Sequence, residues 1–127
     1  MTEFRTPPVL ETTVDAGITT VSCAGELELA TSPRLRDALL TPLGDGTNGI
    51  VADLAAVTFC DSTIFSVLVE TYREAQARNV PYAIAAGPAV ARPLAILGLD
   101  RLLPLHPGVA EARAAVTEPP SAPRLVS

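Results

Sequence analysis

Three consecutive residues with side-chain oxygens, Asp61, Ser62 and Thr63, stand between an apolar stretch and a segment of helical periodicity. This position predicts that they lie at the N-terminus of a helix, where backbone N–H groups lack partners and the helix dipole is positive. A carboxylate or hydroxyl at such a place can cap the helix, and a phosphate added to a hydroxyl meets ready-made donors. The residues alone leave two roles open, helix capping and phosphate acceptance.

Other residue types with catalytic potential are few and scattered. The single histidine, His106, precedes a proline near the end of the chain and is expected in a surface loop. Glu26 and Glu28 are two residues apart, so they share one side of a strand end and face solvent. Cys23 and Cys60 stand in apolar stretches and are expected to be buried thiols. The chain also has no phosphate-binding glycine loop and no metal-ligand spacing, so we predict no enzyme, no cofactor and no metal.

The composition limits the kind of partner. The chain has 127 residues and a net charge of −5, and its nine basic residues are scattered arginines, which argues against nucleic acid binding. A hydrophobic fraction of 48% is enough for one folded core. No apolar run approaches the ~18 residues of a membrane span, and the N-terminus does not resemble a signal peptide. We therefore expect one cytoplasmic domain without membrane insertion.

Strand and helix patterns alternate along the chain and would position these residues. Two β-rich runs flank a turn at 15–17, which predicts a hairpin. Ser32 followed by Pro33 predicts the N-cap and first residue of a helix. The expected strands are 9–14, 18–23, 50–54 and 80–86, and the third extends over 57–60. A further short extended segment is expected at 99–105. The later helices are expected from 61–63 to about 78, over 89–97 and over 107–116.

This order predicts an α/β domain with a mixed, partly parallel sheet of four to five strands and about four helices. The domain is expected to span residues 9–116, after a short lead-in at 1–8. Residues 117–127 are rich in proline and are expected to form a disordered tail.

Four segments in order resemble the STAS family of anti-sigma factor antagonists. They are Gly25–Leu29 (GELEL), the apolar strand Ile50–Leu54 ending in Asp-Leu, Val57–Thr63 (VTFCDST) and Leu94–Leu103 (LAILGLDRLL). Each segment is weakly specific, whereas four at matching spacing are fairly specific. The resemblance covers Val9 to Val116 and implies a STAS-like fold.

The resemblance also implies a switch. In that family the serine after the aspartate accepts phosphate, which falls on Ser62 here, with Thr63 as the secondary candidate. The resemblance implies two partners, an anti-sigma factor of the histidine-kinase-like serine kinase type and a serine phosphatase. The unmodified protein is expected to bind the anti-sigma factor and so release a sigma factor. The expected partner interface comprises Glu26, Glu28, Thr31, Ser32, Asp61, Ser62, Thr63, Ile64, Phe65 and Pro88.

Two positions depart from the family pattern. Ile64 stands where the family usually has glycine, and Glu28 stands where it commonly has aspartate. Ile64 and Phe65 motivate an alternative function, a STAS module without the phosphate switch that serves as a constitutive binding or scaffold subunit of a regulatory or lipid-transport complex. An exposed pair of Ile64 and Phe65 would also support a homodimer.

Overall fold

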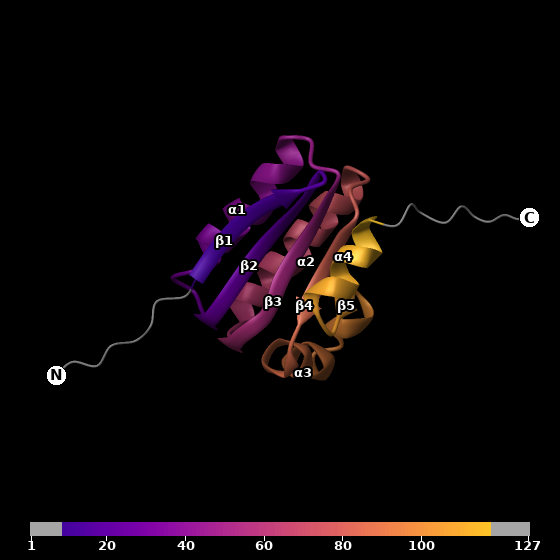
Figure 1. Cartoon of the computed structure of the whole chain (residues 1–127). Coiled ribbons are helices and arrows are strands. Elements are labelled where there is room, and N and C mark those ends of the chain that lie inside the picture. The colour runs from indigo at the N-terminus through magenta and orange to yellow at the C-terminus, as the bar shows by residue number, and fades with distance from the viewer. Residues whose placement is uncertain (1–8, 118–127) are drawn as a thin grey trace, which may run out of the picture.

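The computed structural model describes residues 9–117, in which five strands form one mixed sheet (Figure 1). The strand order is β1-β2-β3-β4-β5, with β1 antiparallel to β2 and the other neighbours parallel. The predicted α/β fold with a mixed, partly parallel sheet is confirmed. The elements are β1 (Val9–Asp15), β2 (Ile18–Leu27), α1 (Ser32–Gly44), β3 (Gly49–Cys60), α2 (Ser62–Ala77), β4 (Tyr82–Ala86), α3 (Pro88–Ile96), a 3₁₀ turn (Leu99–Arg101), β5 (Leu105–His106) and α4 (Val109–Thr117).

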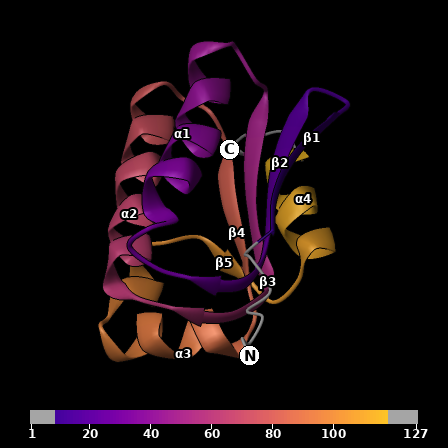
Figure 2. The same ribbon diagram turned by 90° about the vertical axis from the view of Figure 1, so that its left-hand side faces the viewer.

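The sheet separates two layers of unequal size. Helices α1 and α2 lie on one face and α4 lies on the other (Figure 2). The main core lies between the sheet and α1, α2 and α3, and α4 packs over β3 and β4. The largest fully buried side chains are Leu27, Leu35, Leu39, Ile50, Leu54, Ile64, Leu68, Ile84 and Leu94, all in the main core. Since these residues are aliphatic, shape-matched branched side chains hold the layers together.

The predicted hairpin joins β1 to β2 through a two-residue turn. Asp15 pairs with Ile18, and both residues between them have positive φ, 53° at Ala16 and 80° at Gly17. This is the conformation of a type I′ turn, whose twist matches that of antiparallel strands. The turn fixes the register of β1 along the whole of its length.

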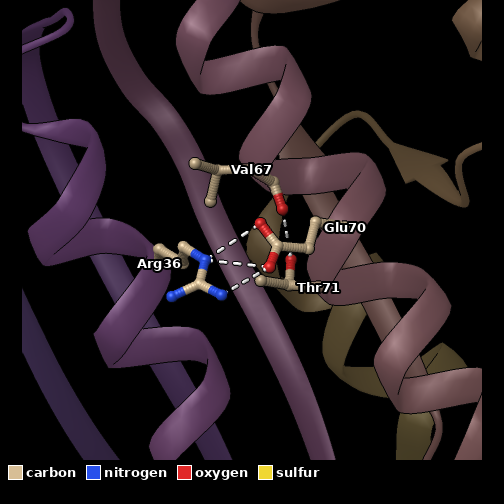
Figure 3. A network of polar contacts seen from close by, with 4 residues as sticks. All are labelled: Arg36, Val67, Glu70 and Thr71. Atoms are coloured by element: carbon tan, nitrogen blue, oxygen red, sulfur yellow. Dashed lines mark hydrogen bonds and ion pairs between the residues drawn. The ribbon is translucent and has the colours of Figure 1, made fainter.

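Polar contacts join the two helices of the main layer to each other and to the sheet. Arg36 of α1 and Glu70 of α2 form a forked pair, with Nε 2.9 and 2.8 Å from the two carboxylate oxygens (Figure 3). Beneath it, the Thr71 hydroxyl lies 2.8 Å from the Val67 carbonyl and 2.7 Å from the Tyr82 hydroxyl. Burial raises the pKa of Tyr82, so this phenol stays neutral and hydrogen-bonded. These contacts fix the position of α2 over the sheet.

Two local predictions need correction. Thr31 occupies the N-cap position of α1, and Ser32 is the first helical residue. The Ser32 hydroxyl donates to the Leu29 carbonyl at 3.1 Å and so supports the preceding loop instead of capping the helix. The segment 99–105, expected to be extended, begins as a 3₁₀ turn because Gly98 adopts the left-handed conformation, with φ 76°, and ends α3.

The ends of the chain are described only in part. Thr117, which the predicted tail included, is the last residue of α4. The predicted lead-in at 1–8 and the rest of the predicted tail, 118–127, lie outside the described residues.

Candidate functional site

The carboxyl ends of β2 and β3 meet at one edge of the sheet, because parallel strands end on the same side. Leu27, at the end of β2, pairs with Cys60, and its carbonyl accepts a hydrogen bond from the Asp61 N–H at 3.2 Å. Just before this point Gly25 has φ 89°, and the register between the strands shifts from Gly25 to Glu26. The glycine of the GELEL segment thus permits an irregularity that directs the end of β2 toward the start of α2.

Asp61 joins the start of α2 to the loop after β2. One carboxylate oxygen accepts the Thr63 N–H at 3.0 Å together with the Thr63 hydroxyl, and the other accepts the Leu29 N–H at 3.1 Å. Hydrogen bonds from the Thr63 hydroxyl, and then from the backbone N–H groups of Thr63 and Leu29, lower the pKa of Asp61 below its ordinary value. The side chain is therefore a fixed anion and the N-cap of the helix.

Ser62 and Thr63 differ in the state of their hydroxyl groups. Ser62 is the first residue of α2 and is exposed, and no residue between 9 and 117 bonds its hydroxyl. Thr63 is half-buried, and its hydroxyl already donates to Asp61. Of the two candidate phosphate acceptors, Ser62 presents the hydroxyl that an incoming reactant can reach.

A groove of about 710 Å³ begins at Ser62 and follows α2. Its lining residues come from α2 and from the segment after α3, and they are Ser62, Phe65, Ser66, Val69, Glu70, Arg73, Glu74, Leu97 and Leu99. Of the large exposed apolar side chains nearby, Leu97 (58%) lines the groove, Leu29 (66%) belongs to the residue whose N–H bonds the Asp61 carboxylate, and Phe59 (51%) lies two residues before Asp61 in the chain. Exposed apolar side chains near one reachable hydroxyl have the character of a protein-binding surface.

Comparison with known proteins agrees with this arrangement. A family model of the STAS domain matches residues 9–112. The chain belongs to the STAS family. This STAS domain is 31% identical over 86 residues to the anti-sigma-F factor antagonist RsfB of Mycobacterium tuberculosis, covering 67% of the chain and 70% of the relative. It is 29% identical over 100 residues to the anti-sigma-B factor antagonist of Staphylococcus aureus, covering 78% and 93%.

A solved structure shows the same similarity in three dimensions. The STAS domain superposes on the crystal structure of an anti-sigma factor antagonist from Mycobacterium paratuberculosis with a TM-score of 0.80 and 31% identity. The match covers 88% of this chain and 96% of the other.

The ten predicted interface residues of the STAS domain fall into three groups, one of which, Asp61 and Thr63, is half-buried. Glu26, Glu28 and Pro88 are exposed near the carboxyl ends of the strands, as is Ser62. Four others are buried, namely Thr31, Ser32, Ile64 and Phe65. The predicted exposure of the Ile64–Phe65 pair is wrong, because the first turn of α2 directs both side chains into the main core. Ile64 therefore does not stand in front of the Ser62 hydroxyl.

Sequence reasoning missed the exposed apolar residues at this edge. Phe59 lies two residues after buried Val57 in the same strand, so strict alternation would place it inside. Leu97 directly follows α3 and continues its apolar pattern. A weak sequence signal for their exposure was available, because each of these residues stands at the end of a helix or strand, where fewer core residues surround a side chain.

The cysteines and the possible metal ligands of the described residues do not form a second reactive site. Burial raises the pKa of Cys23 and of Cys60 to about 12, so both remain protonated thiols in the main core. Within residues 9–117 no three His, Cys, Asp or Glu side chains gather in a way that could hold a metal ion. None of the helices in the same range has the length and apolar content that crossing a bilayer requires.

The carboxylate of Asp61 should make a pH-dependent contribution to stability. Because its pKa is lower in the folded chain, its contribution is fully present above the ordinary value of 3.8 and is lost as the pH falls through the lowered value. Asp61→Asn keeps an oxygen for Thr63 but no longer accepts the Leu29 N–H. We expect Asp61→Asn to lower the free energy of unfolding at pH 7, with a smaller difference from the wild type below pH 3.8, as measured by urea unfolding.

Asp45→Asn is the matched control, because Asp45 is an exposed carboxylate on the loop after α1. It should not show the loss of stability at pH 7. If Asp61→Asn is as stable as the wild type at pH 7, Asp61 does not hold the loop to the helix.

Proposed function

We propose that this STAS domain is an anti-sigma factor antagonist that binds an anti-sigma factor and so releases a sigma factor, under the control of phosphorylation at Ser62. The observation that carries the proposal is the exposed hydroxyl of Ser62 at the start of α2, which no residue between 9 and 117 bonds and which stands beside the fixed anion of Asp61. The names of the relatives, which are anti-sigma factor antagonists, support the antagonist part of the proposal. Such a switch acts on transcription, which places it in the bacterial cytoplasm.

The proposed partner is an anti-sigma factor that is also a serine kinase of the histidine-kinase-like type. In the transfer step, the Ser62 oxygen forms a bond to the γ-phosphorus of ATP while the bond to the bridging oxygen breaks and ADP leaves. The hydroxyl proton passes to a base of the kinase. A serine phosphatase restores the hydroxyl by hydrolysis. The kinase and the phosphatase supply the catalytic groups, so the STAS domain needs only to present its serine.

The unmodified surface suits a packed contact. The groove along α2 and the exposed side chains of Leu29, Phe59 and Leu97 provide apolar area close to Ser62. Glu26 and Glu28 flank buried Leu27, and their exposed side chains form a polar rim. An apolar centre with a polar rim is the usual anatomy of a protein interface.

Phosphorylation would disrupt that contact for two reasons. A phosphoserine carries about −1.5 to −2 charges at pH 7 and would stand next to the Asp61 carboxylate, which is held ionised. Within a closed interface this charge would also lose its hydration. Repulsion and desolvation act in the same direction, so the phosphorylated protein releases the anti-sigma factor.

The experiment that tests the proposal is affinity purification of the tagged full chain from its native host, followed by peptide mass spectrometry. We expect recovery of a kinase-like anti-sigma factor and a phosphate on Ser62 in part of the recovered chain. The matched baits are Ser62→Ala and Thr63→Ala, of which only the first should abolish the phosphate.

Two results would contradict the proposal. Failure to recover any anti-sigma factor with the wild-type bait would remove the assigned partner. Recovery of that partner with Ser62 unmodified, even when phosphatases are inhibited during lysis, would indicate a constitutive binding module in place of a phosphate switch.

A further inference from the structure

Strand β1 forms an open edge of the sheet. Within residues 9–117 it hydrogen-bonds only to β2, and it lies at the outer left side of the sheet (Figure 1). Six of its seven residues are exposed, including two valines, Val9 at 47% and Val14 at 69%. The outer backbone groups of such a strand can pair with another strand.

The edge also lacks the features that usually prevent pairing. The segment VLETTVD contains no lysine and no proline, and its register with β2 runs without a bulge from Val9 opposite Ala24 to Asp15 opposite Ile18. Its two charges are Glu11 and Asp15, and the Asp15 carboxylate is 3.2 Å from the Arg113 guanidinium. Little in the strand opposes the addition of a neighbour.

We propose that a second copy of this chain pairs antiparallel with β1 about a two-fold axis at Thr12, joining two five-stranded sheets into one. A two-fold axis perpendicular to the sheet keeps α1 and α2 of both copies on the same face of the joined sheet. Directly opposed residues point to the same face, and side chains alternate between faces along a strand. The sequence numbers of two opposed residues must therefore differ by an even number. The three most central registers then have the axis at Glu11, at Thr12 or at Thr13. The positions of the charged residues Glu11 and Asp15 distinguish these three registers.

Only the register at Thr12 avoids opposing like charges. With the axis at Glu11, two glutamates face each other, and with the axis at Thr13, Glu11 faces the Asp15 of the second copy. With the axis at Thr12, all seven residues pair and Glu11 faces Thr13. Among the three central registers, this one alone pairs the whole strand without directly opposing like charges.

The same register covers exposed apolar surface. Leu10, Thr12 and Val14 lie on the face of the sheet covered by α1, as their partners Cys23, Val21 and Thr19 show. Pairing about Thr12 places Leu10 of each copy opposite Val14 of the other. Val14 lines a hollow of about 600 Å³ between β1 and α1, whose other lining residues include Thr19, Ala38 and Pro42. The second copy would bring a leucine side chain to the rim of this hollow.

The dimer would leave the phosphate switch accessible. Ser62 lies at the end of the sheet where β3 ends, whereas the pairing runs along the outer side of β1. The two-fold axis reverses the strand direction, so the two Ser62 residues would point in opposite directions. The inference is therefore independent of the proposed function, since either can fail alone.

Cross-linking tests the register directly. In the proposed dimer the two Thr12 Cα atoms lie about 4.5–5.5 Å apart, within disulfide range. The two Val14 Cα atoms would be separated by four residues along the strand, at least ~13 Å. We expect the full chain with Thr12→Cys to form a disulfide-linked dimer under mild oxidation, whereas Val14→Cys stays monomeric on a denaturing gel. Both native cysteines are buried and do not compete.

A charge test at Thr13 measures the affinity. In the proposed register Thr13→Arg creates two ion pairs with Glu11, and Thr13→Glu creates two repulsive pairs. By sedimentation equilibrium we expect the wild-type chain to dimerise reversibly, with Thr13→Arg about tenfold tighter and Thr13→Glu about tenfold weaker. Thr13 is exposed, so both variants should fold.

Three results would overturn the inference. The wild-type chain could remain monomeric at every concentration, which would leave the edge free or reserved for a strand of another protein. Val14→Cys could cross-link as readily as Thr12→Cys, which would place the copies in another register. Both charge variants at Thr13 could dimerise like the wild type, which would place the interface elsewhere.

Discussion

Replacing Ser62 by aspartate is expected to weaken binding of the anti-sigma factor by at least about a hundredfold, which corresponds to ~3 kcal/mol. The Ser62 side chain lies beside Asp61, whose lowered pKa keeps it ionised at neutral pH. A second carboxylate at the first turn of α2 would bring like charges together in a surface that must lose water on binding. Titration calorimetry with the purified anti-sigma factor measures the change.

Two further variants separate the switch from a general effect of charge. Ser62→Ala removes the acceptor without adding charge, so it should bind about as tightly as the wild type and should no longer respond to ATP. Ser66→Asp places the same charge one turn further along α2, where it lines the same groove but is removed from Asp61. We expect it to weaken binding much less than Ser62→Asp. Equal binding by Ser62→Asp and the wild type would rule out the switch.

Local sequence signals predicted the elements that local chemistry controls. The hairpin is predicted from Asp15-Ala16-Gly17, in which Gly17 suits the positive φ of the second turn residue, whereas Ala16 adopts a φ of 53° that alanine rarely has. The start of α2 at Asp61–Thr63 follows from the capping oxygens. The four strand-and-helix alternations after the initial hairpin predicted a mixed, partly parallel sheet, and the observed strand directions confirm it.

Exposure at the site could not be predicted in the same way, because it depends on which side of α2 the sheet covers. Ile64 and Phe65 follow an exposed serine, and their burial depends on how the Asp61 cap and the Arg36–Glu70 contact set the rotation of the helix. Phe59 is exposed although its strand is otherwise mostly apolar, because β3 extends beyond β4 toward the site. These are long-range packing effects that one sequence does not display.

The departure of Ile64 from the family glycine therefore has a structural explanation. Its side chain is fully buried in the main core, beneath the first turn of α2, and does not reach the surface that Ser62 occupies. The hydroxyl of Ser62 stays exposed beside it. A larger residue at this position adds to the core without closing the site.

Replacing Ile64 by glycine, the residue typical of the family, is accordingly expected to lower the free energy of unfolding by about 3–5 kcal/mol. Removal of a fully buried isoleucine side chain leaves a cavity, and glycine adds conformational freedom to the unfolded chain. The matched control, Ile64→Val, removes a single methylene and should lose only about 1 kcal/mol. Urea unfolding monitored by circular dichroism gives both values.

The same pair of variants separates a core role from an interface role. If Ile64 belongs to the core, Ile64→Val should bind the anti-sigma factor as tightly as the wild type, and the loss in Ile64→Gly should appear in stability before it appears in affinity. A stable Ile64→Gly protein with greatly weakened binding would mean that the isoleucine contacts the partner instead. In that case the first turn of α2 must rotate on binding, since Ile64 is inaccessible in the free domain.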